Sequence, residues 1–507
     1  MSYLLSLDIG TTSVKAGLFD SQGTCLATAL EEYRLITPKA DQVELDPATY
    51  WTASCNTLRS VLDQADIDRE LVSALTVSSQ GETLISLDEQ GNPVRNAIIW
   101  MDNRAVSQVE KLKRTLGSNV YDITGIPEIV PTWPACKILW LKENEPENYD
   151  RTAKFMLVQD YLIYKLTGKF VTDGSISCTT LLFDIIHHDW WMESLNAIGL
   201  ERSQLPAVQM AGSIAGNLIS EAAQILGLHS VIPVVCGGMD QSVGAIGAGN
   251  IEEGVVSETT GAALAVQVCI QHPLIDPNRN TPVYVHSVTG RYLFVPVCPT
   301  AGMAFKWFKD NFVIPDAACQ MSDDPTNYYE LMNEMASQVP AGCDGLVMLP
   351  HLMGAFSPEA NPFARGSFTG FTLHHRKEHF VRSIQEAVAF MLRQNIEAVQ
   401  KVGVKVNEIR TSGGASRSQI WNQIKADVCG LPIVKLDNED TGLVGDAILG
   451  GVATGVFPSI SDACAVMVHT STRIEPSDAV VEYEKYYRRY IDFEATTKTY
   501  FIRNYSD

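Results

Sequence analysis

Near its N-terminus the chain places a turn of glycine and hydroxyl side chains between two short apolar runs, within the segment from Tyr3 to Asp20. Apolar runs of this length around a tight turn predict a β-hairpin, with Asp8 near the end of its first strand. Gly10 lets the backbone approach a ligand closely, and successive N–H groups of such a turn can surround phosphate oxygens. The segment therefore predicts an anion-binding hairpin, with an ordinary polar hairpin as the alternative.

The side chains around this turn suit a phosphate group and its cation. Thr11, Thr12 and Ser13 bring three hydroxyl groups, and Lys15 adds a positive charge. Asp8 can hold a Mg²⁺ ion through the waters bound to the ion. These residue types strengthen the prediction of a phosphate site.

A similar pattern returns in the middle of the chain, at residues 254–268. There Thr259, Thr260 and Gly261 form a turn between two apolar runs. Two such turns that face each other would clamp a polyphosphate from both sides. The repeat predicts a second half of the molecule that opens with its own phosphate-facing hairpin.

The composition excludes several classes of partner. With 507 residues the chain should form about two to four domains, and 46% hydrophobic and 19% charged residues are typical of a globular protein. The net charge of -21 argues against a nucleic acid or an anionic membrane as partner. No apolar run approaches the roughly 18 residues that span a bilayer, and the N-terminus lacks the basic start and apolar core of a signal peptide. The 11 cysteines, none in a C-x-x-C spacing, indicate reduced core thiols in a cytoplasmic protein.

Polar clusters follow two predicted strands. An apolar run at residues 71–78 predicts a buried strand that ends at a cluster with Gln80 and Glu82, and a later apolar strand leads into Trp100. Small polar ligands are commonly bound where strands end, so these side chains are candidate ligand contacts. The alternative is a solvated loop for Gln80 and Glu82 and a core position for Trp100.

Another strand runs into an acidic residue at residues 232–242, where an apolar run passes through two glycines to Asp240 and Gln241. A helix rich in small residues follows. An aspartate at a strand end beside a helix N-terminus is well placed to accept a proton from a hydroxyl group. As the alternative, Asp240 only caps that helix.

A glycine pair in a later segment offers a backbone contact for a nucleotide. An amphipathic helix is predicted to start near Gly302, and a strand at residues 408–412 leads to Gly413, Gly414 and Ala415. A glycine pair between a strand and a helix lets the backbone approach a base or an α-phosphate. This signal is weak when it stands alone.

Two groups of charged or titratable side chains are assigned no chemistry. Lys137 and Lys142 lie on a predicted helix and are expected to be solvated. His374, His375 and His379 lie where a helix begins. We expect these histidines to be solvated, because no carboxylate or cysteine completes a metal-ligand set.

Taken together and in this order, the motifs resemble the FGGY family of carbohydrate kinases, in the actin-like ATPase superfamily, over most of the chain. The resembling segments are Asp8-Ile-Gly-Thr-Thr-Ser13 (first phosphate hairpin), Lys137-Ile-Leu-Trp-Leu-Lys-Glu-Asn144 (first signature), Gly238-Met-Asp240-Gln241 (catalytic base), Thr259-Thr260-Gly261 (second phosphate turn) and Gly413-Gly414-Ala415 (adenosine segment). The order of the motifs is more specific than any single one.

The resemblance implies an α/β fold with two actin-like (ribonuclease H-like) domains, in which helices flank mixed sheets and the active site lies in the interdomain cleft. Residues 1–245 would form the sugar and phosphate side, and residues 246–507 would form the nucleotide side. The implied cofactors are ATP and Mg²⁺. The chain has no P-loop motif, so ATP would be bound by the hairpin turns instead.

The resemblance also implies a role for each matched position. Asp240 would be the catalytic base and a second candidate metal ligand, and Asp8 would be the acid that holds Mg²⁺ through water. The contacts to ATP would come from Thr11, Thr12, Ser13, Lys15, Thr260, Gly261, Gly302, Lys306, Gly414, Ala415 and Ser418. The contacts to the sugar would come from Gln80, Glu82, Trp100, Asp240 and Gln241.

Departures from the family pattern bear on the substrate. Glycerol kinases resemble this chain at Gln80 and Glu82, but they carry an arginine at the position of Gly81, and their substrate-facing tyrosine aligns with Thr132. Xylulose kinases usually carry a Met-His pair after the glutamine, which this chain lacks. Gly81 is expected to leave room for a ligand larger than a triol. The expected substrate is therefore a ketose, such as the pentulose xylulose, with an erythritol- or glycerol-like polyol as the alternative.

Two other functional classes stay open at this point. One is a non-kinase actin-like ATPase, which would not need a polar sugar site, and the other is a regulatory relative that binds a sugar without turnover. The expected partner is a small-molecule sugar or polyol, with no nucleic acid and no membrane. A homodimer is one alternative for the assembly.

Overall fold

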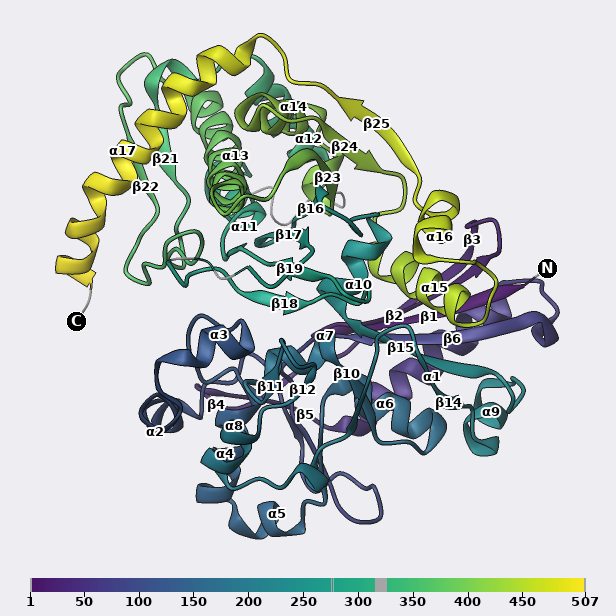
Figure 1. Ribbon diagram of the computed structural model, residues 1–507. Helices are drawn as coiled ribbons and strands as arrows, with labels where there is room; N and C mark the ends of the chain where they lie inside the picture. Colours follow the sequence, from purple (N-terminus) through teal and green to yellow (C-terminus); the bar gives the residue numbers. More distant parts are fainter. Residues whose placement is uncertain (1, 275, 277, 315–325, 506–507) are drawn as a thin grey trace. The chain divides into compact units, whose positions relative to one another are not determined.

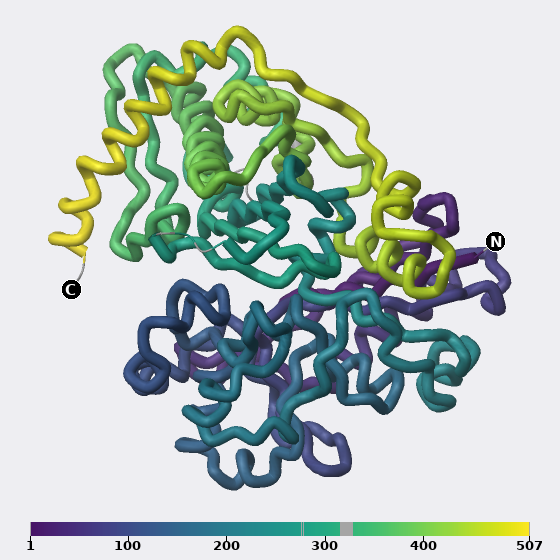
Figure 2. Tube along the Cα trace, viewed as in Figure 1, coloured from purple at the N-terminus to yellow at the C-terminus, as the bar shows by residue number. Residues whose placement is uncertain are grey.

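The computed structural model describes residues 2–274, 276, 278–314 and 326–505. The chain divides into two compact units, each formed from separate stretches of sequence. Unit 1 is Met1–Glu252, Cys269–Leu293 and Asp440–His469, and unit 2 is Glu253–Val268, Phe294–Glu439 and Thr470–Asp507. This division differs from a single boundary after residue 245, because the segment 440–469 packs beside the N-terminal strands (Figure 2).

Unit 1 is built on a six-stranded sheet with the strand order β14-β15-β6-β1-β2-β3 (Figure 1). Its strands are β1 (Tyr3–Ile9), β2 (Ser13–Asp20), β3 (Cys25–Glu32), β6 (Val72–Ser79), β14 (Ile214–Asn217) and β15 (Pro233–Met239). β1 and β2 form the predicted hairpin, and β6 pairs in parallel with both β1 and β15. The carboxyl ends of these three parallel strands therefore meet at one edge of the sheet, near Asp8, Gln80 and Asp240.

Helices and short strands surround this sheet. The helices are α1 (Pro47–Gln64), α2 (Val106–Leu116), α3 (Val120–Thr124), α4 (Pro134–Asn144), α5 (Pro146–Arg151), α6 (Val158–Thr167), α7 (Gly174–Ser177), α8 (Met192–Ile198), α9 (Ser220–Leu226), α10 (Asp240–Gly247), α15 (Thr441–Ala453) and α16 (Ile460–Met467), with 3₁₀ turns η1 (Arg69–Leu71), η2 (Gly117–Asn119), η3 (Cys178–Thr180) and η4 (Arg202–Gln204). The short strands are β4 (Ile36–Lys39), β5 (Gln42–Leu45), β7 (Ile85–Leu87), β8 (Ala97–Ile98), β9 (Lys154–Met156), β10 (Val171–Asp173), β11 (Phe183–Asp184), β12 (Asp189–Trp190), β13 (Ala207–Gln209), β18 (Val283–Val285) and β19 (Tyr292–Phe294).

The two faces of the unit 1 sheet bury different helices. Along β1, Leu5, Leu7 and Ile9 join the hydrophobic core formed with α1 and α6. Leu4 joins the opposite core, which is formed with α10, α15 and α16. This alternation follows from the two-residue side-chain period of a strand. Residues of β1 are thus buried on both sides, which holds the strand end at Asp8 in a fixed place.

Unit 2 contains part of a second sheet, and the strand order within that part is β17-β16-β23-β24-β25. Its strands are β16 (Gly254–Thr260), β17 (Leu264–Ile270), β20 (Val297–Cys298), β23 (Val406–Ser412), β24 (Ile433–Leu436) and β25 (Thr470–Ile474), and β21 (Val347–Leu349) and β22 (Ser367–Thr369) form a separate pair. β16 and β17 are the predicted second hairpin, and β16 pairs in parallel with β23. The two segments predicted to contact the nucleotide, at the ends of β16 and β23, therefore lie at one edge of this sheet.

The helices of unit 2 pack around α13, which is labelled in the upper part of Figure 1. They are α11 (Gly302–Phe308), the π-helical turn η5 (Lys309–Val313), α12 (Thr326–Ser337), η6 (Cys343–Gly345), α13 (Lys377–Lys401), η7 (Gly414–Arg417), α14 (Gln419–Cys429) and α17 (Ala479–Tyr505). The ring centroids of Phe390 on α13 and Tyr490 on α17 lie 5.3 Å apart. The C-terminal helix is thus anchored by buried aromatic side chains.

Among the described residues, no helix combines the length and the apolar character that a membrane span requires. Every described cysteine is free, and all except Cys25 and Cys429 are buried. This burial agrees with the prediction of core thiols. Cys319 lies outside the described residues.

Candidate functional site

The tip of the first hairpin is held by backbone and tyrosine hydrogen bonds. The Gly10 N–H donates to the Ser13 carbonyl at 2.9 Å, and the Tyr33 hydroxyl donates to the Gly10 carbonyl at 2.5 Å. Thr12 at the tip is exposed, while Thr11 is half-buried. The turn therefore offers a fixed backbone and accessible hydroxyl groups, as an anion site requires.

Lys15 already has an ionic partner in unit 1. The strand register places it opposite Asp8, and its ammonium group forms an ion pair with Asp440, which precedes α15. Both side chains are partly exposed to solvent. A phosphate ligand would therefore share this ammonium group with Asp440.

Carboxyl groups at the ends of β1 and β6 influence the ionisation of a third, at the end of β15. Burial raises the pKa of Asp240 to about 8, and the nearby charges of Asp8 and Glu82 add to the rise. Burial also raises the pKa of Asp8 to about 6, against the opposing effect of Lys15. Clusters of carboxyl groups with raised pKa values are typical of functional sites.

Asp240 is the first residue of α10, and Met239 occupies the N-cap position. One Asp240 carboxylate oxygen, Oδ1, accepts the N–H of Gln241 at 2.6 Å. The other oxygen, Oδ2, has no such backbone partner among the hydrogen bonds of the described residues. The alternative prediction, in which Asp240 acts only as the helix N-cap, is therefore wrong.

Several buried oxygen atoms at this edge lack a partner within the described part of the chain. They are Asp8 Oδ1, Gln80 Oε1 and Gln241 Oε1. Buried polar atoms are rarely left without a hydrogen bond, so these oxygens indicate contacts that a ligand or ion would complete. A Cβ atom at Gly442 on α15 would lie 2.9 Å from Asp8 Oδ2, so glycine there keeps space open at the carboxylate.

The prediction that Lys137 is solvated is wrong. Its side chain is fully buried, and the ammonium group donates to the carbonyls of Glu82 at 2.9 Å and Ile99 at 3.0 Å. Burial lowers the pKa of Lys137, and it raises the pKa of Glu82. The amphipathic pattern of α4 did not indicate this burial, because the lysine reaches into the polar loops at the ends of β6 and β8.

Lys137 therefore joins the two loops that carry the predicted sugar contacts. Glu82 adopts a φ of 57°, a left-handed conformation that is uncommon outside glycine. The Lys137 ammonium group binds the carbonyl of this residue and the carbonyl just before Trp100. One buried cation thus fixes the backbone on both sides of the candidate sugar site.

Gln80 and Trp100 have different surroundings. Gln80 is buried, and its Nε2 donates to the Tyr50 hydroxyl at 3.0 Å. Trp100 is 37% exposed, so it is not the core aromatic that the alternative prediction assigned, and its Nε1 donates to Thr11 Oγ1 at 2.9 Å. The tryptophan therefore links the loop after β8 to the tip of the first hairpin.

Gly81 was expected to leave room for a ligand larger than a triol, but a neighbouring side chain lies close to it. A Cβ atom at Gly81 would lie 2.9 Å from Thr179 Oγ1 and 3.5 Å from Met239 Sδ. Thr179 thus fills the direction in which a side chain at position 81 would point. Space for a larger ligand does not follow from this glycine alone.

In unit 2 a fully buried ion pair forms between Lys425 and Glu258 of the second hairpin. Lys425 on α14 donates to Glu258 Oε1 at 2.6 Å and to Thr260 Oγ1 at 3.0 Å. The Thr260 hydroxyl in turn donates to Glu258 Oε2 at 2.7 Å. The hydroxyl of Thr260 is thus engaged inside the protein, so a phosphate contact at this residue would use its backbone N–H.

The glycines of unit 2 lie against this hairpin. A Cβ atom at Gly302 would lie 2.2 Å from the Gly261 carbonyl oxygen, to which the Gly302 N–H donates at 3.0 Å. A Cβ atom at Gly413 would lie 3.1 Å from Thr259 Cγ2, whereas one at Gly414 would meet no atom within 4 Å. The structure thus brings Gly261 together with Gly302, and it leaves open space at Gly414.

The remaining predicted nucleotide residues have partners of their own. Ser418 caps α14, accepting the Trp421 N–H at 3.2 Å and donating to Asn333 Oδ1 at 2.8 Å. Lys306 is exposed and forms an ion pair with Asp310 one turn further along, at 2.5 Å. The Ser418 hydroxyl therefore serves the protein itself, and Lys306 lies on the helix surface.

Sequence reasoning did not find Asp446, which lies inside α15 and is fully buried. It accepts the Ser78 hydroxyl at 2.7 Å, and a Cβ atom at Gly237 would lie 2.4 Å from its Oδ1. Burial raises its pKa well above the usual range, and the charge of Asp8 contributes to the rise. The one sequence feature that could have indicated Asp446 is that it is the only acidic residue within the apolar, glycine-containing helix α15.

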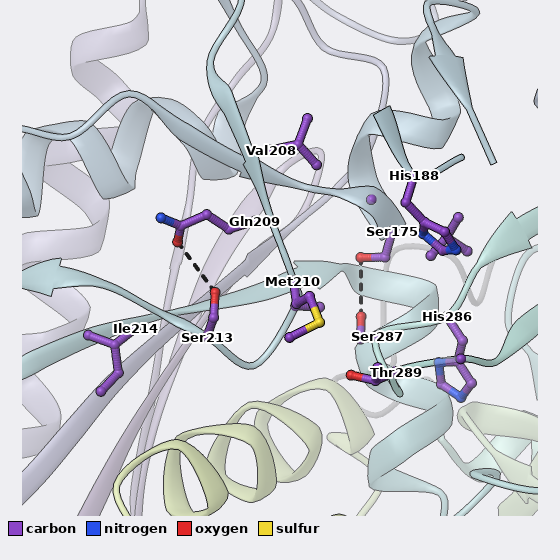
Figure 3. Close-up of a pocket in the computed structure, with 14 residues that line it drawn as sticks. Ser175, His188, Val208, Gln209, Met210, Ser213, Ile214, His286, Ser287 and Thr289 are labelled. Carbon is purple, nitrogen blue, oxygen red and sulfur yellow. Dashed lines mark hydrogen bonds between the residues drawn. The ribbon is translucent and has the colours of Figure 1, made fainter. Parts of the chain in front are cut away.

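A cavity of about 710 Å³ in unit 1 is lined by none of the predicted site residues (Figure 3). The Ser175 and Ser287 hydroxyls at its wall are joined by a 3.1 Å hydrogen bond, and Ser175 also accepts the Met239 N–H at 3.1 Å. The lining thus contacts the backbone just before Asp240 without containing a charged group. We therefore place the candidate sugar site at the strand ends and not in this cavity.

Known structures resemble the whole chain. A gluconate kinase and a ligand-bound xylulose kinase, both from Lactobacillus acidophilus, each superpose with a TM-score of 0.90 at 26% identity, covering 100% of this chain and 99% of theirs. These proteins have two-domain actin-like folds. The predicted α/β fold with two actin-like domains is confirmed.

Curated relatives give the same result over nearly the full length. A xylulose kinase of Bacillus subtilis is 28% identical over 98% of this chain and 98% of its own length. A gluconokinase of the same species is 30% identical over 95% of this chain and 93% of its own length. The models of the N-terminal and C-terminal domains of the FGGY family of carbohydrate kinases match residues 3–247 and 266–454. The chain therefore belongs to the FGGY family of carbohydrate kinases, which are phosphotransferases with a sugar hydroxyl as acceptor.

Proposed function

We propose that this protein transfers the γ-phosphate of ATP to a hydroxyl of a neutral ketose, with a pentulose such as xylulose as the first candidate. The observation that carries the proposal is Asp240, an acid of raised pKa at the start of α10, beside Asp8 and Glu82. Relatives named xylulose kinase support this class of substrate. A polyol is the second candidate, because Gln80 and Glu82 match the pattern of glycerol kinases.

Asp240 would act as the general base. It orients a sugar hydroxyl and accepts its proton while the oxygen attacks the phosphoryl group, a form of assistance that contributes about 10²–10⁴ in rate. The Gln241 N–H holds one carboxylate oxygen, which leaves the other for the hydroxyl. Positioning and charge stabilisation supply most of the catalysis of phosphoryl transfer, so the fixed place of this carboxylate matters as much as its basicity.

The residues around Asp8 fit a divalent cation. Its Oδ1 is buried without a partner within the described residues, and the glycine at position 442 keeps any side chain away from the other oxygen. Asp8 would hold Mg²⁺ through water, with Asp240 as a second candidate ligand. When bound, ATP would supply the phosphoryl group, and Mg²⁺ would supply positive charge to offset the charge of the phosphates. Thr11, Thr12, Ser13 and Lys15 would contact the phosphates.

Under this proposal the second half of the chain, from residue 246, supplies further nucleotide contacts. Gly261 and Gly302 would let the nucleotide approach the backbone closely, although their N–H groups already donate to the carbonyls of Ala263 and Gly261. The open space at Gly414 beside Ala415 suits a base or ribose. Thr260 would contribute through its backbone. Lys306 and Ser418 need a change of partner before they could contact ATP, so they are the weaker candidates.

A neutral acceptor fits the candidate sugar site better than gluconate does. Three carboxyl groups, those of Asp8, Glu82 and Asp240, lie near one another, and each one that is ionised would repel a substrate carboxylate. The amide groups of Gln80 and Gln241 each have a buried oxygen available as an acceptor for a sugar hydroxyl. Trp100 offers a partly exposed ring as one wall.

The test is a variant of the proposed base. Asp240→Asn keeps the size of the side chain but removes its basicity, so we expect kcat for the ketose to fall by about 10²–10⁴. ATP binding, measured by calorimetry, should remain within about twofold, because the amide still accepts the Gln241 N–H. Near-normal turnover in this variant would remove Asp240 from the proposed role.

The substrate class needs a separate assay. ADP release by the unmodified protein should be stimulated by ketopentoses more than by erythritol, glycerol or gluconate. Preference for a polyol would favour the second candidate. Preference for gluconate would contradict the proposal that the carboxyl groups of the site disfavour an anionic sugar.

A further inference from the structure

The expectation that no carboxylate accompanies the histidines of the α13 start is wrong. The structure brings Asp344, from the turn η6, to His374 and His379. One ligand atom from each of these three side chains lies within 4.8 Å of the others. Asp344 precedes the two histidines by about thirty residues or more in the sequence, so no motif spacing indicated this group.

The distances match a metal site better than they match ordinary ion pairs. Asp344 Oδ2 lies 3.3 Å from His374 Nε2 and 3.2 Å from His379 Nε2. Charge-assisted hydrogen bonds are shorter, about 2.7–2.9 Å. Zinc bonds of about 2.0–2.2 Å to imidazole nitrogen and carboxylate oxygen give tetrahedral edges of about 3.3–3.5 Å. The two distances from Asp344 Oδ2 thus match those between ligands of one ion, and the ligand atoms of the two imidazoles lie within 4.8 Å of each other.

The backbone holds Asp344 in an uncommon conformation. Cys343 and Asp344 have φ values of 51° and 52°, in the left-handed region that glycine normally occupies. Such conformations persist where the surrounding structure maintains them, and they cluster at functional sites. The Asp344 side chain is 39% exposed and that of His374 is 73% exposed, so an ion can reach the group from solvent.

We propose that Asp344, His374 and His379 form a binding site for a divalent transition metal of the zinc class, with water as the fourth ligand. Two imidazoles and one carboxylate are a usual ligand set for zinc. The ion would tie the turn at residues 343–345 to the loop before α13 and to the first turn of that helix. This site is separate from the Mg²⁺ that Asp8 is proposed to hold.

Binding requires one proton to move. His379 Nδ1 accepts the Arg376 N–H at 3.2 Å, so its neutral ring carries the proton on Nε2. When zinc binds Nε2, that proton is replaced and the ring takes a proton on Nδ1. The hydrogen bond that is lost lies at a helix N-terminus, where backbone N–H groups have no intrahelical partner and can bind water instead.

His375 provides a matched control. It is the direct neighbour of His374, and its ring centroid lies 5.1 Å from that of His379. Its two nitrogen atoms, however, face the backbone: Nδ1 accepts the Thr372 N–H at 2.9 Å, and Nε2 lies 3.1 Å from the Cys343 carbonyl. His375 is therefore expected not to bind the ion.

The experiment is calorimetric titration of the metal-free, full-length protein with Zn²⁺. All forms carry Cys25→Ser, which removes the exposed thiol among the described cysteines. We expect one zinc per chain, weakened by at least about tenfold in His374→Ala and in Asp344→Asn and unchanged in His375→Ala. His374 is largely exposed, so its variant should fold normally, and circular dichroism checks this.

Two further readouts make the result decisive. Zn²⁺ should raise Tm of the parent protein and leave Tm of His374→Ala nearly unchanged, and Co²⁺ should give the intense visible absorption of a tetrahedral site only where His374 is present. Zinc affinity equal in the parent and in both ligand variants would overturn the proposal. So would the absence of zinc binding by the parent.

Discussion

At the scale of single residues, the ammonium group of Lys137 is the clearest case of a side chain whose position sets that of others. It is buried and has two carbonyl partners, one at Glu82 and one just before Trp100. Its attraction for the Glu82 carboxylate opposes the effect of burial on the pKa of Glu82. Under the proposed function, a residue placed in this way would position the sugar contacts at Glu82 and Trp100.

We therefore expect Lys137→Met to raise KM for the sugar by about tenfold or more, because two unpaired carbonyls would let both loops relax. The affinity for ATP should change little. Steady-state kinetics against both substrates measures the split. Lys142→Met, on the same helix but with a partly exposed ammonium group, is the control, and an equal effect of both variants on KM would contradict the positioning role.

Some positions of single residues could be predicted from the sequence, and others could not. Asp8, Gln80, Glu82 and Asp240 stand at strand ends, and a strand end can be read from a local pattern of apolar residues and glycines. The burial of Lys137 could not, because it depends on loops that lie 38 and 55 positions away in sequence. The roles of all these residues stay predictions until variants are measured.

At the scale of elements, α11 and the second hairpin depend on close backbone contact. The methyl group of Gly302→Ala would lie 2.2 Å from the Gly261 carbonyl oxygen, so the helix must move away from the turn. We expect this variant to lower the free energy of unfolding by about 1–3 kcal/mol, in the range of an overpacked site, and to weaken ATP binding.

Gly414→Ala is the matched comparison, because its added methyl group would meet no protein atom within 4 Å. Its stability should be nearly unchanged, and a loss of ATP affinity would then come from contact with the nucleotide itself. Denaturant unfolding and nucleotide titration of both variants test this pair. Unaltered ATP affinity in both would argue against a nucleotide contact at this edge of the sheet.

A second element-scale prediction concerns His286, which links α10 to the segment that follows β18. The Ser242 hydroxyl lies 3.0 Å from His286 Nδ1, and the Nε2 atom lies 3.0 Å from the Asn250 carbonyl. The carbonyl can only accept, so Nε2–H donates to it and the ring is neutral. Burial lowers the pKa of His286 to about 4.

A lowered pKa means that the unfolded chain binds the proton first as the pH falls. The contribution of His286 to stability is therefore full above about pH 6.5 and is lost progressively towards pH 4, by roughly 3 kcal/mol at most. Other groups titrate in this range, so the measurement is the difference between the parent and His286→Gln. A difference in unfolding free energy that does not shrink between pH 7 and pH 4 would contradict the assignment.

At the scale of the whole molecule, the net charge of -21 opposes the approach of an anionic nucleotide. The Debye length falls from about 30 Å at 0.01 M salt to about 8 Å at 0.15 M, so salt screens this repulsion. We expect KM for ATP to fall by about twofold or more over this range, while KM for a neutral ketose stays constant. Kinetics at matched Mg²⁺ concentrations measure both values, and a KM for ATP that rises with salt would contradict repulsion by the net charge as the limiting factor.

The sequence by itself determined the hairpins, the strand ends with their acids and the order of the motifs, because turn chemistry and side-chain periodicity act between residues close along the chain. Family membership followed from that order, and the comparisons confirmed it. Only the tertiary structure decided that residues 440–469 pack with unit 1, that Lys137 is buried and that Asp344 meets two histidines. Each of these outcomes depends on contacts between distant segments, whose pairing is set by the packing of the whole unit and leaves no local periodic signal.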